Sequence, residues 1–128
     1  MSVHTTTLEI QIKEIRRLRV NEKEIIEADF SNCNEDRIME ILSHVRSMIS
    51  MGNKPHRTLG IFNEKSLLTP KVMNYFNTGR IDPSLLERQA VVGLPSMRKG
   101  IIKGHNILQG NDIRIFESRE EAIIYLSE

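Results

Sequence analysis

Polar side chains follow the apolar segments of this chain at the points where strands are expected to end. Asp29 and Ser31 close one such segment, Asn63 and Glu64 close the next, and Ser96 follows a third. In an open α/β sheet, ligands bind beyond the carboxyl ends of the strands. The sequence therefore predicts a small polar crevice at this edge. The alternative is that these side chains only cap turns and helices.

A second candidate is an anion site at a helix expected to open at Ser96. The first turn of a helix offers free N–H groups and a positive dipole to an anion. Arg98, Lys99 and Lys103 add positive charge to the same helix. Because the segment GLPSMRK matches neither of the common glycine-rich phosphate loops, a solvated basic face is the alternative to contact with phosphate or anionic lipid.

Metal and nucleophile chemistry have little support in the sequence. The histidines His4, His44, His56 and His105 are scattered, with no cysteine or carboxylate at the spacing of metal ligands. Cys33 lies just before an expected helix, and a helix N-terminus can lower the pKa of a thiol. A reactive thiol is therefore the alternative to an inert one. We expect no metal, no cofactor and no catalytic set.

Composition narrows the class of partner. Eighteen basic and seventeen acidic residues in 128 leave a net charge of +1, so no global field favours nucleic acid or an anionic membrane. The basic cluster Arg16, Arg17 and Arg19 has no interleaved aromatic residues, which nucleic-acid surfaces use for stacking. We expect no nucleic-acid partner.

The number of cysteines and the first residues indicate the cellular compartment of the protein. A single cysteine allows no internal disulfide and fits a reducing cytoplasm. The opening MSVHTTTLEI has no basic region followed by an apolar one, so a secretory signal is not expected. No apolar run approaches the roughly 20 residues of a membrane span. The sequence predicts a soluble cytoplasmic protein.

Five segments have the patterns of strands. Residues 8–12 alternate apolar and polar side chains, as in a half-buried strand, although Ile12, Ile15 and Leu18 also fit one face of a helix. The segment VNEK at residues 20–23 predicts a turn, which favours an antiparallel hairpin with the next strand. The other strands are predicted at residues 25–30, 58–62, 90–92 and 111–116.

Caps, prolines and glycines mark the helices. Asn34 is a good N-cap, and an apolar stripe at three- and four-residue spacing follows it. Thr69 is a cap followed by proline at the first helical position, and Ser118 with Glu121 forms a capping box. Helices are therefore predicted at residues 34–52, 69–79, from 96 and from 118, with a short turn after Asp82-Pro83.

The order of elements is β-β-α-β-α-β-α-β-α. This order predicts one α/β domain over residues 1–128, with a mixed, mostly parallel sheet of about five strands covered by helices. A chain of this length buries about two-thirds of its unfolded surface. Residues 90–92 are apolar at every position, which is typical of a strand near the middle of such a sheet.

The predicted strands and helices resemble those of the STAS-like proteins, which share the fold of bacterial anti-sigma-factor antagonists, and in particular those of the SpoIIAA-like group. The segments that carry the resemblance are EIIEADFSNC, TLGIFN, LTPKVMNYF, AVVGLPSMRKGIIKGHNIL and IRIFESREEAIIYL. The resemblance implies STAS topology over nearly the whole chain. It also implies a non-enzymatic regulatory or binding module in cytoplasmic signalling that acts on an unidentified protein partner.

Antagonists of this kind carry a phosphorylatable serine in an Asp-Ser turn after a central strand. The matching segment IFNEKSLLTPK has no Asp-Ser pair, and its hydroxyls are those of Ser66 and Thr69. Thr69 is explained as an N-cap, which leaves Ser66 as the candidate phosphoacceptor.

Two classes of function stay open. The first is the regulatory or binding module. The second is a small-ligand protein or enzyme that holds a nucleotide, a lipid or acyl tail, or another small anion in the crevice. A homodimer formed through sheet edges is a further alternative. The candidate ligand-binding residues are Asp29, Ser31, Asn63, Ser66, Thr69, Ser96 and Arg98.

Overall fold

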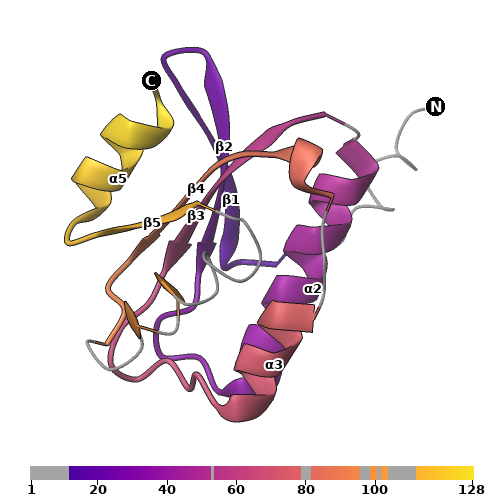
Figure 1. Cartoon of the computed structure of the whole chain (residues 1–128), viewed down its shortest axis with the longest axis vertical. Coiled ribbons are helices and arrows are strands. Elements are labelled where there is room, and N and C mark those ends of the chain that lie inside the picture. The colour runs from indigo at the N-terminus through magenta and orange to yellow at the C-terminus, as the bar shows by residue number, and fades with distance from the viewer. Residues whose placement is uncertain (1–11, 53, 79–81, 96–98, 101, 104–111) are drawn as a thin grey trace.

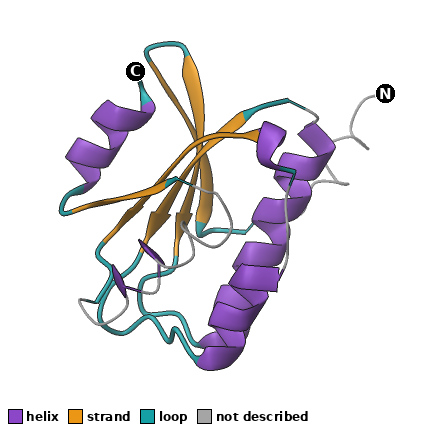
Figure 2. Ribbon diagram, in the orientation of Figure 1, coloured by secondary structure: helices purple, strands orange, loops and turns teal. Residues whose placement is uncertain are grey.

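The fold is known from a computed structural model, which describes residues 12–52, 54–78, 82–95, 99–100, 102–103 and 112–128 (Figures 1 and 2). The strands are β1 (Ile15–Val20), β2 (Lys23–Asp29), β3 (His56–Ile61), β4 (Leu86–Val92) and β5 (Ile113–Phe116). Among these residues, helices with defined bounds are α2 (Glu35–Gly52), α3 (Pro70–Thr78) and α5 (Arg119–Leu126), and a 3-10 turn, η1 (Pro83–Leu85), precedes β4.

The five strands form one sheet in the order β1-β2-β3-β4-β5. β1 runs antiparallel to β2, and every other neighbouring pair is parallel. Helices α2 and α3 cover one face, whereas α5 lies on the other (Figure 1). These findings confirm the predicted α/β class and the mixed, mostly parallel five-stranded sheet.

The first hairpin corrects one sequence-based alternative. A helical face through Ile12, Ile15 and Leu18 is wrong, because residues from Ile15 onward form β1. Ile15 packs against the core beneath α2, and Leu18 packs against the core beneath α5, so the two side chains lie on opposite faces of the sheet. The predicted turn is confirmed, with Asn21 and Glu22 both at positive φ (51° and 66°) between β1 and β2.

Strand β4 lies inside the sheet between β3 and β5, as its apolar sequence predicts. Ala90 and Val92 belong to the core under α5, whereas Val91 belongs to the core under α2 and α3. All three side chains are buried. A strand that is covered on both faces needs apolar residues at consecutive positions.

The predicted caps of the described helices are confirmed. The Arg37 N–H donates to the side-chain oxygen of Asn34 at 2.9 Å, and the Val72 N–H donates to the Thr69 hydroxyl at 3.3 Å. At α5, the hydroxyl of Ser118 accepts from the Glu121 N–H at 3.2 Å. These bonds satisfy N–H groups that have no partner within their helix.

Helix α5 is fastened to the sheet at its C-terminal end by two arginines from adjacent strands. Arg57 Nη1 donates to the carbonyl of Leu126 at 2.7 Å, and Arg88 Nη1 donates to that of Tyr125 at 2.6 Å. Cations favour the negative end of a helix, where carbonyl groups lack internal partners. A helix of eight residues is thereby held at a fixed position over β3, β4 and β5.

Some predicted features lie outside the described residues. They are the alternating segment at residues 8–11, the helix stop at Gly79, the helix start at Ser96 with Arg98, and residues 104–111. Lys99, Gly100, Ile102 and Lys103 are described, and all four are helical.

Candidate functional site

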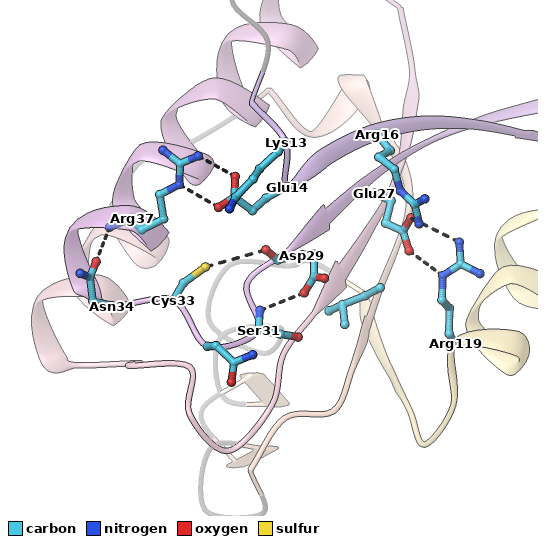
Figure 3. Close-up of a pocket in the computed structure, with 12 residues that line it drawn as sticks. Lys13, Glu14, Arg16, Glu27, Asp29, Ser31, Cys33, Asn34, Arg37 and Arg119 are labelled. Carbon is cyan, nitrogen blue, oxygen red and sulfur yellow. Dashed lines mark hydrogen bonds and ion pairs between the residues drawn. The ribbon is translucent and has the colours of Figure 1, made fainter.

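A groove opens at the carboxyl end of β2, between the first turns of α2 and α5 (Figure 3). We call it the β2-end groove. Its lining comes from the turn before β1, from β1 and β2, from the loop into α2, and from α2, β3 and α5. The residues that line it are Lys13, Glu14, Arg16, Glu27, Asp29, Ser31, Asn32, Cys33, Asn34, Arg37, Ile61 and Arg119.

One wall is an ion pair between Arg37 of α2 and Glu14, which precedes β1. Arg37 Nη2 and Nε donate to the two carboxylate oxygens of Glu14 at 2.6 and 2.9 Å, and Arg37 Nη1 reaches Glu40 at 2.6 Å. The hydrogen bond from Arg37 holds the pKa of Glu14 below its usual value. Such a two-pronged contact fixes both the charge and the orientation of the guanidinium.

The opposite wall is built around Glu27, whose side chain is only 2% exposed. Arg16 Nη2 donates to its Oε1 at 2.9 Å, and Arg119 Nε donates to its Oε2 at 2.6 Å. Burial acts to raise the pKa of Glu27, but the hydrogen bonds from Arg119 and Arg16 outweigh burial and lower it. The carboxylate is thus ionised and shared by two arginines from different elements.

The floor contains Asp29, Ser31 and Cys33. A carboxylate oxygen of Asp29 accepts from the Ser31 N–H at 2.9 Å, which forms a tight turn after β2. The thiol of Cys33 is buried and lies 4.0 Å from the carbonyl oxygen of Asp29. Burial, followed by the charges of Glu14 and Asp29, raises the pKa of the Cys33 thiol. This direction is opposite to the one that activates a thiol.

Asn63 and Ser66 join the end of β3 to the loop after β2. The side-chain oxygen of Asn63 accepts from the Asn32 N–H at 3.0 Å, and its nitrogen donates back to Asn32 Oδ1 at 2.9 Å. The Ser66 hydroxyl is buried, donates to the Phe30 carbonyl at 2.8 Å and accepts from the Asn63 N–H at 3.0 Å. Asn63 therefore supports the groove through Asn32, and Ser66 braces the loop beneath it.

Thr69 lies away from the groove, at the start of α3. Besides capping that helix, its hydroxyl donates to a carboxylate oxygen of Glu35 in the first turn of α2. The two helices are thus linked at their N-termini.

The structure therefore places two of the predicted ligand-binding residues, Asp29 and Ser31, directly in the groove. Asn63 supports its rim, whereas Ser66 and Thr69 serve in structural hydrogen bonds. Ser96 and Arg98 lie outside the described residues, so the anion site remains a prediction.

The glycine before the predicted anion site has a structural reason of its own. Gly93 has a φ of 78°, and a Cβ there would stand 2.1 Å from the carbonyl oxygen of Phe62. Only glycine fits so close to that carbonyl at this backbone conformation.

Sequence reasoning missed the ion pairs that form both walls. Glu14, Glu27, Arg37 and Arg119 did not stand out in a chain in which 27% of residues are charged. Glu27 carried a usable signal, because it interrupts an otherwise apolar strand, IIEA, at a position that must be buried. A charged residue at such a position needs a partner of opposite charge.

No group of three or more His, Cys, Asp and Glu side chains gathers as a metal site within the described parts of the chain. His56 is buried at the start of β3, and its Nδ1 finds no hydrogen-bond partner among those residues. None of the described helices is long and apolar enough to cross a membrane.

Within the groove, the pKa of the Cys33 thiol is raised, and the carboxylates of Glu14 and Glu27 are held in ion pairs with arginines. Basic and acidic side chains both line the groove, which suits a ligand surface that carries both signs at fixed positions. Comparison with protein families, with curated proteins and with solved structures finds no match to this chain.

Proposed function

We propose that the chain is a non-enzymatic, STAS-like regulatory or binding module that acts through protein–protein contacts, with the β2-end groove as its contact site. The sequence resemblance and the order of strands and helices support the STAS-like assignment. One observation carries the proposed site: three ion pairs, formed by residues of β1, β2, α2, α5 and the turn before β1, line one open groove. A partner that matches this pattern gains specificity from charge complementarity.

The state of the candidate nucleophiles supports binding over catalysis. The Ser66 hydroxyl donates to a main-chain carbonyl, and that of Thr69 donates to the Glu35 carboxylate. The pKa of the Cys33 thiol is raised by burial. Activation of a nucleophile requires an adjacent base or a lowered pKa, and Ser66 and Cys33 have neither. The Thr69 hydroxyl has a carboxylate beside it, but it also accepts the Val72 N–H as the cap of α3, and it does not line the groove.

The proposal is tested by affinity capture with the full chain from a native lysate of the source organism, followed by mass spectrometry. Lys13 lines the groove, is exposed and has no ion pair with a described residue, so Lys13→Glu changes the groove charge without breaking a wall. Lys71→Glu on α3 is the control outside the groove, because Lys71 is 63% exposed and its 3.9 Å ion pair with Glu35 should contribute little. We expect a reproducible partner that Lys13→Glu loses and Lys71→Glu keeps. Equal capture by both variants would contradict the proposed site.

The second candidate function is binding of a small anionic ligand in the same groove. It is favoured by Lys13 together with the exposed sides of Arg16 and Arg119, which supply positive charge at the rim. A thermal-shift screen with nucleotides and acyl phosphates tests it, because a ligand that binds only the native state raises the melting temperature. A shift that Lys13→Glu abolishes would support this function, and a flat screen would remove it.

A further inference from the structure

β1 is the first strand of the sheet and pairs on one side only, with β2. Its six residues align with β2 without a bulge, from Ile15 opposite Ala28 to Val20 opposite Lys23. Among the described residues no strand pairs with the outer side of β1. A regular edge of this kind presents a row of main-chain N–H and C=O groups to a further strand.

The hairpin decides which main-chain groups point outward. A two-residue loop makes Val20 and Lys23 the closing hydrogen-bonded pair, and hydrogen-bonded pairs then alternate along an antiparallel ladder. Leu18 and Arg16 therefore bond to β2, whereas Arg17 and Arg19 direct their N–H and C=O groups to the open edge. The bond from the Asp29 N–H to the Glu14 carbonyl at 2.9 Å continues the same alternation.

The side chains of this edge carry positive charge that few carboxylates balance. Arg17 and Arg19 lie two residues apart and so share one face of β1, while Arg16 lies on the other. Arg19 lies 3.7 Å from the Glu24 carboxylate, which Lys54 also contacts, at 3.0 Å. No ion pair joins Arg17 to a carboxylate of the described chain, although its charge helps to lower the pKa of Glu24.

We propose that the outer edge of β1 binds an acidic, extended segment of a partner protein as an added strand. The segment would place two carboxylates, two residues apart, beside Arg17 and Arg19. An apolar residue between them would lie beside Leu18, on the opposite face. The inference extends the proposed function to a second contact surface, and it rests on that function only in taking the partner to be a protein.

Charge also argues against a second copy of this chain at the same edge. Two copies of β1 would bring arginines of one strand beside arginines of the other, and like charges opposed across a ladder are destabilising. Arginine guanidinium groups bind carboxylates through two hydrogen bonds, so an acidic strand gains side-chain contacts in addition to the main-chain ladder.

The test uses the full chain and a labelled Glu-Val-Glu-Val-Glu peptide, with Lys-Val-Lys-Val-Lys as the charge control. Fluorescence anisotropy should detect binding of the acidic peptide alone. Arg17→Glu/Arg19→Glu should weaken that binding about tenfold or more and allow the basic peptide to bind, because charge pairs across the interface then reverse. Arg114→Glu, on the opposite edge strand, is the matched control and should bind as the unaltered chain does.

Amide hydrogen exchange measured by NMR separates an added strand from a simple charged patch. Bound peptide should protect the N–H groups of Arg17 and Arg19 from exchange. Binding without that protection would overturn the proposal, and so would protection of both amides before peptide is added. Binding of a single-stranded RNA oligomer that shows the same variant dependence, or a dimer by light scattering, would also overturn it.

The two proposals fail separately. Lys13→Glu should leave peptide binding intact, because Lys13 precedes β1 and lines the groove. Loss of a captured partner in Lys13→Glu without any peptide binding would leave the proposed function standing and remove the inference. Peptide binding at the edge, with no effect of Lys13→Glu on capture, would keep the inference and remove the β2-end groove as the contact site.

Discussion

The Glu27 carboxylate and the Arg119 guanidinium meet at 2.6 Å, although 92 residues separate them in the sequence. Glu27 lies in β2 and Arg119 is the first residue of α5, so this contact fixes the N-terminal end of the last helix. Arg57 and Arg88 fix its other end through carbonyl groups. The second face of the sheet is thus closed by a helix whose two ends are both held by arginine contacts.

Removal of Glu27 should be costly. Glu27→Ala takes away hydrogen bonds to two arginines and leaves a gap beside the core, so we expect a loss of about 2 kcal/mol in the free energy of unfolding. The expected loss is small for a buried carboxylate because Arg16 and Arg119 are partly exposed, so water can solvate both guanidinium groups in the variant. Urea denaturation measures it. Glu24→Ala, at an exposed carboxylate, is the control and should leave the midpoint nearly unchanged.

Stability should fall in acid. The pKa values of Glu14, Glu27 and Glu87 are lowered in the folded chain relative to the ordinary 4.5. The unfolded chain therefore binds protons more readily, so the stabilisation is complete above the unfolded pKa and is lost as pH falls through the folded values. Urea midpoints measured from pH 7 to pH 3 should decline below about pH 4.5. Glu27→Gln should show a shallower decline, and an unchanged slope would contradict the assignment.

The hairpin turn contains a residue whose replacement should stabilise the protein. Glu22 has a φ of 66°, a conformation that costs an ordinary L-residue about 1 kcal/mol. Relief of this conformation in Glu22→Gly should raise the free energy of unfolding by about 1 kcal/mol. The greater freedom of glycine in the unfolded chain should offset part of that gain, so we expect a net increase below this value. Asn21→Gly is the comparison, and it should gain less because asparagine tolerates positive φ. Thermal melting of both variants decides the matter.

Ser66 should behave as a structural residue. Ser66→Ala removes the donor to the Phe30 carbonyl and the acceptor for the Asn63 N–H, at a cost of about 1–2 kcal/mol. Ser66→Asp should destabilise more, because the added carboxylate would be buried beside a carbonyl oxygen. Ser31→Ala, in the groove, serves as the control. A native-like melting temperature for Ser66→Asp would show that the site accepts charge and would restore Ser66 as a phosphoacceptor.

Local signals made most of the fold predictable. Asn34, Thr69 and Ser118 each cap a helix through bonds that span only three residues, so sequence alone reveals them. The apolar run at the end of β4 likewise reports burial on both faces. β1 was harder to recognise because Arg16, Arg17 and Arg19 interrupt its alternation. An edge strand has no neighbour on one side, and its charged side chains reach water from both faces.

The site was less predictable than the fold. Asp29 and Ser31 followed from the rule that ligands bind at strand ends, and both line the groove. The pairing of Glu27 with Arg119 depends on α5 crossing to the face opposite α2. No local pattern encodes which face a terminal helix takes. The charged walls therefore became visible only with the sheet order and the register in hand.

Because α5 alone covers the second face of the sheet among the described helices, its position affects how the chain folds during synthesis. The core between the sheet and helices α2 and α3 draws on residues up to Ile115, whereas the core on the other face also needs Ala122 and Leu126. A ribosome releases the N-terminal part of a protein first. Until residues 119–126 emerge, the nascent sheet therefore exposes Ile25, Leu59 and Ala90 to solvent, and this interval is when a chaperone would find the most apolar surface to bind.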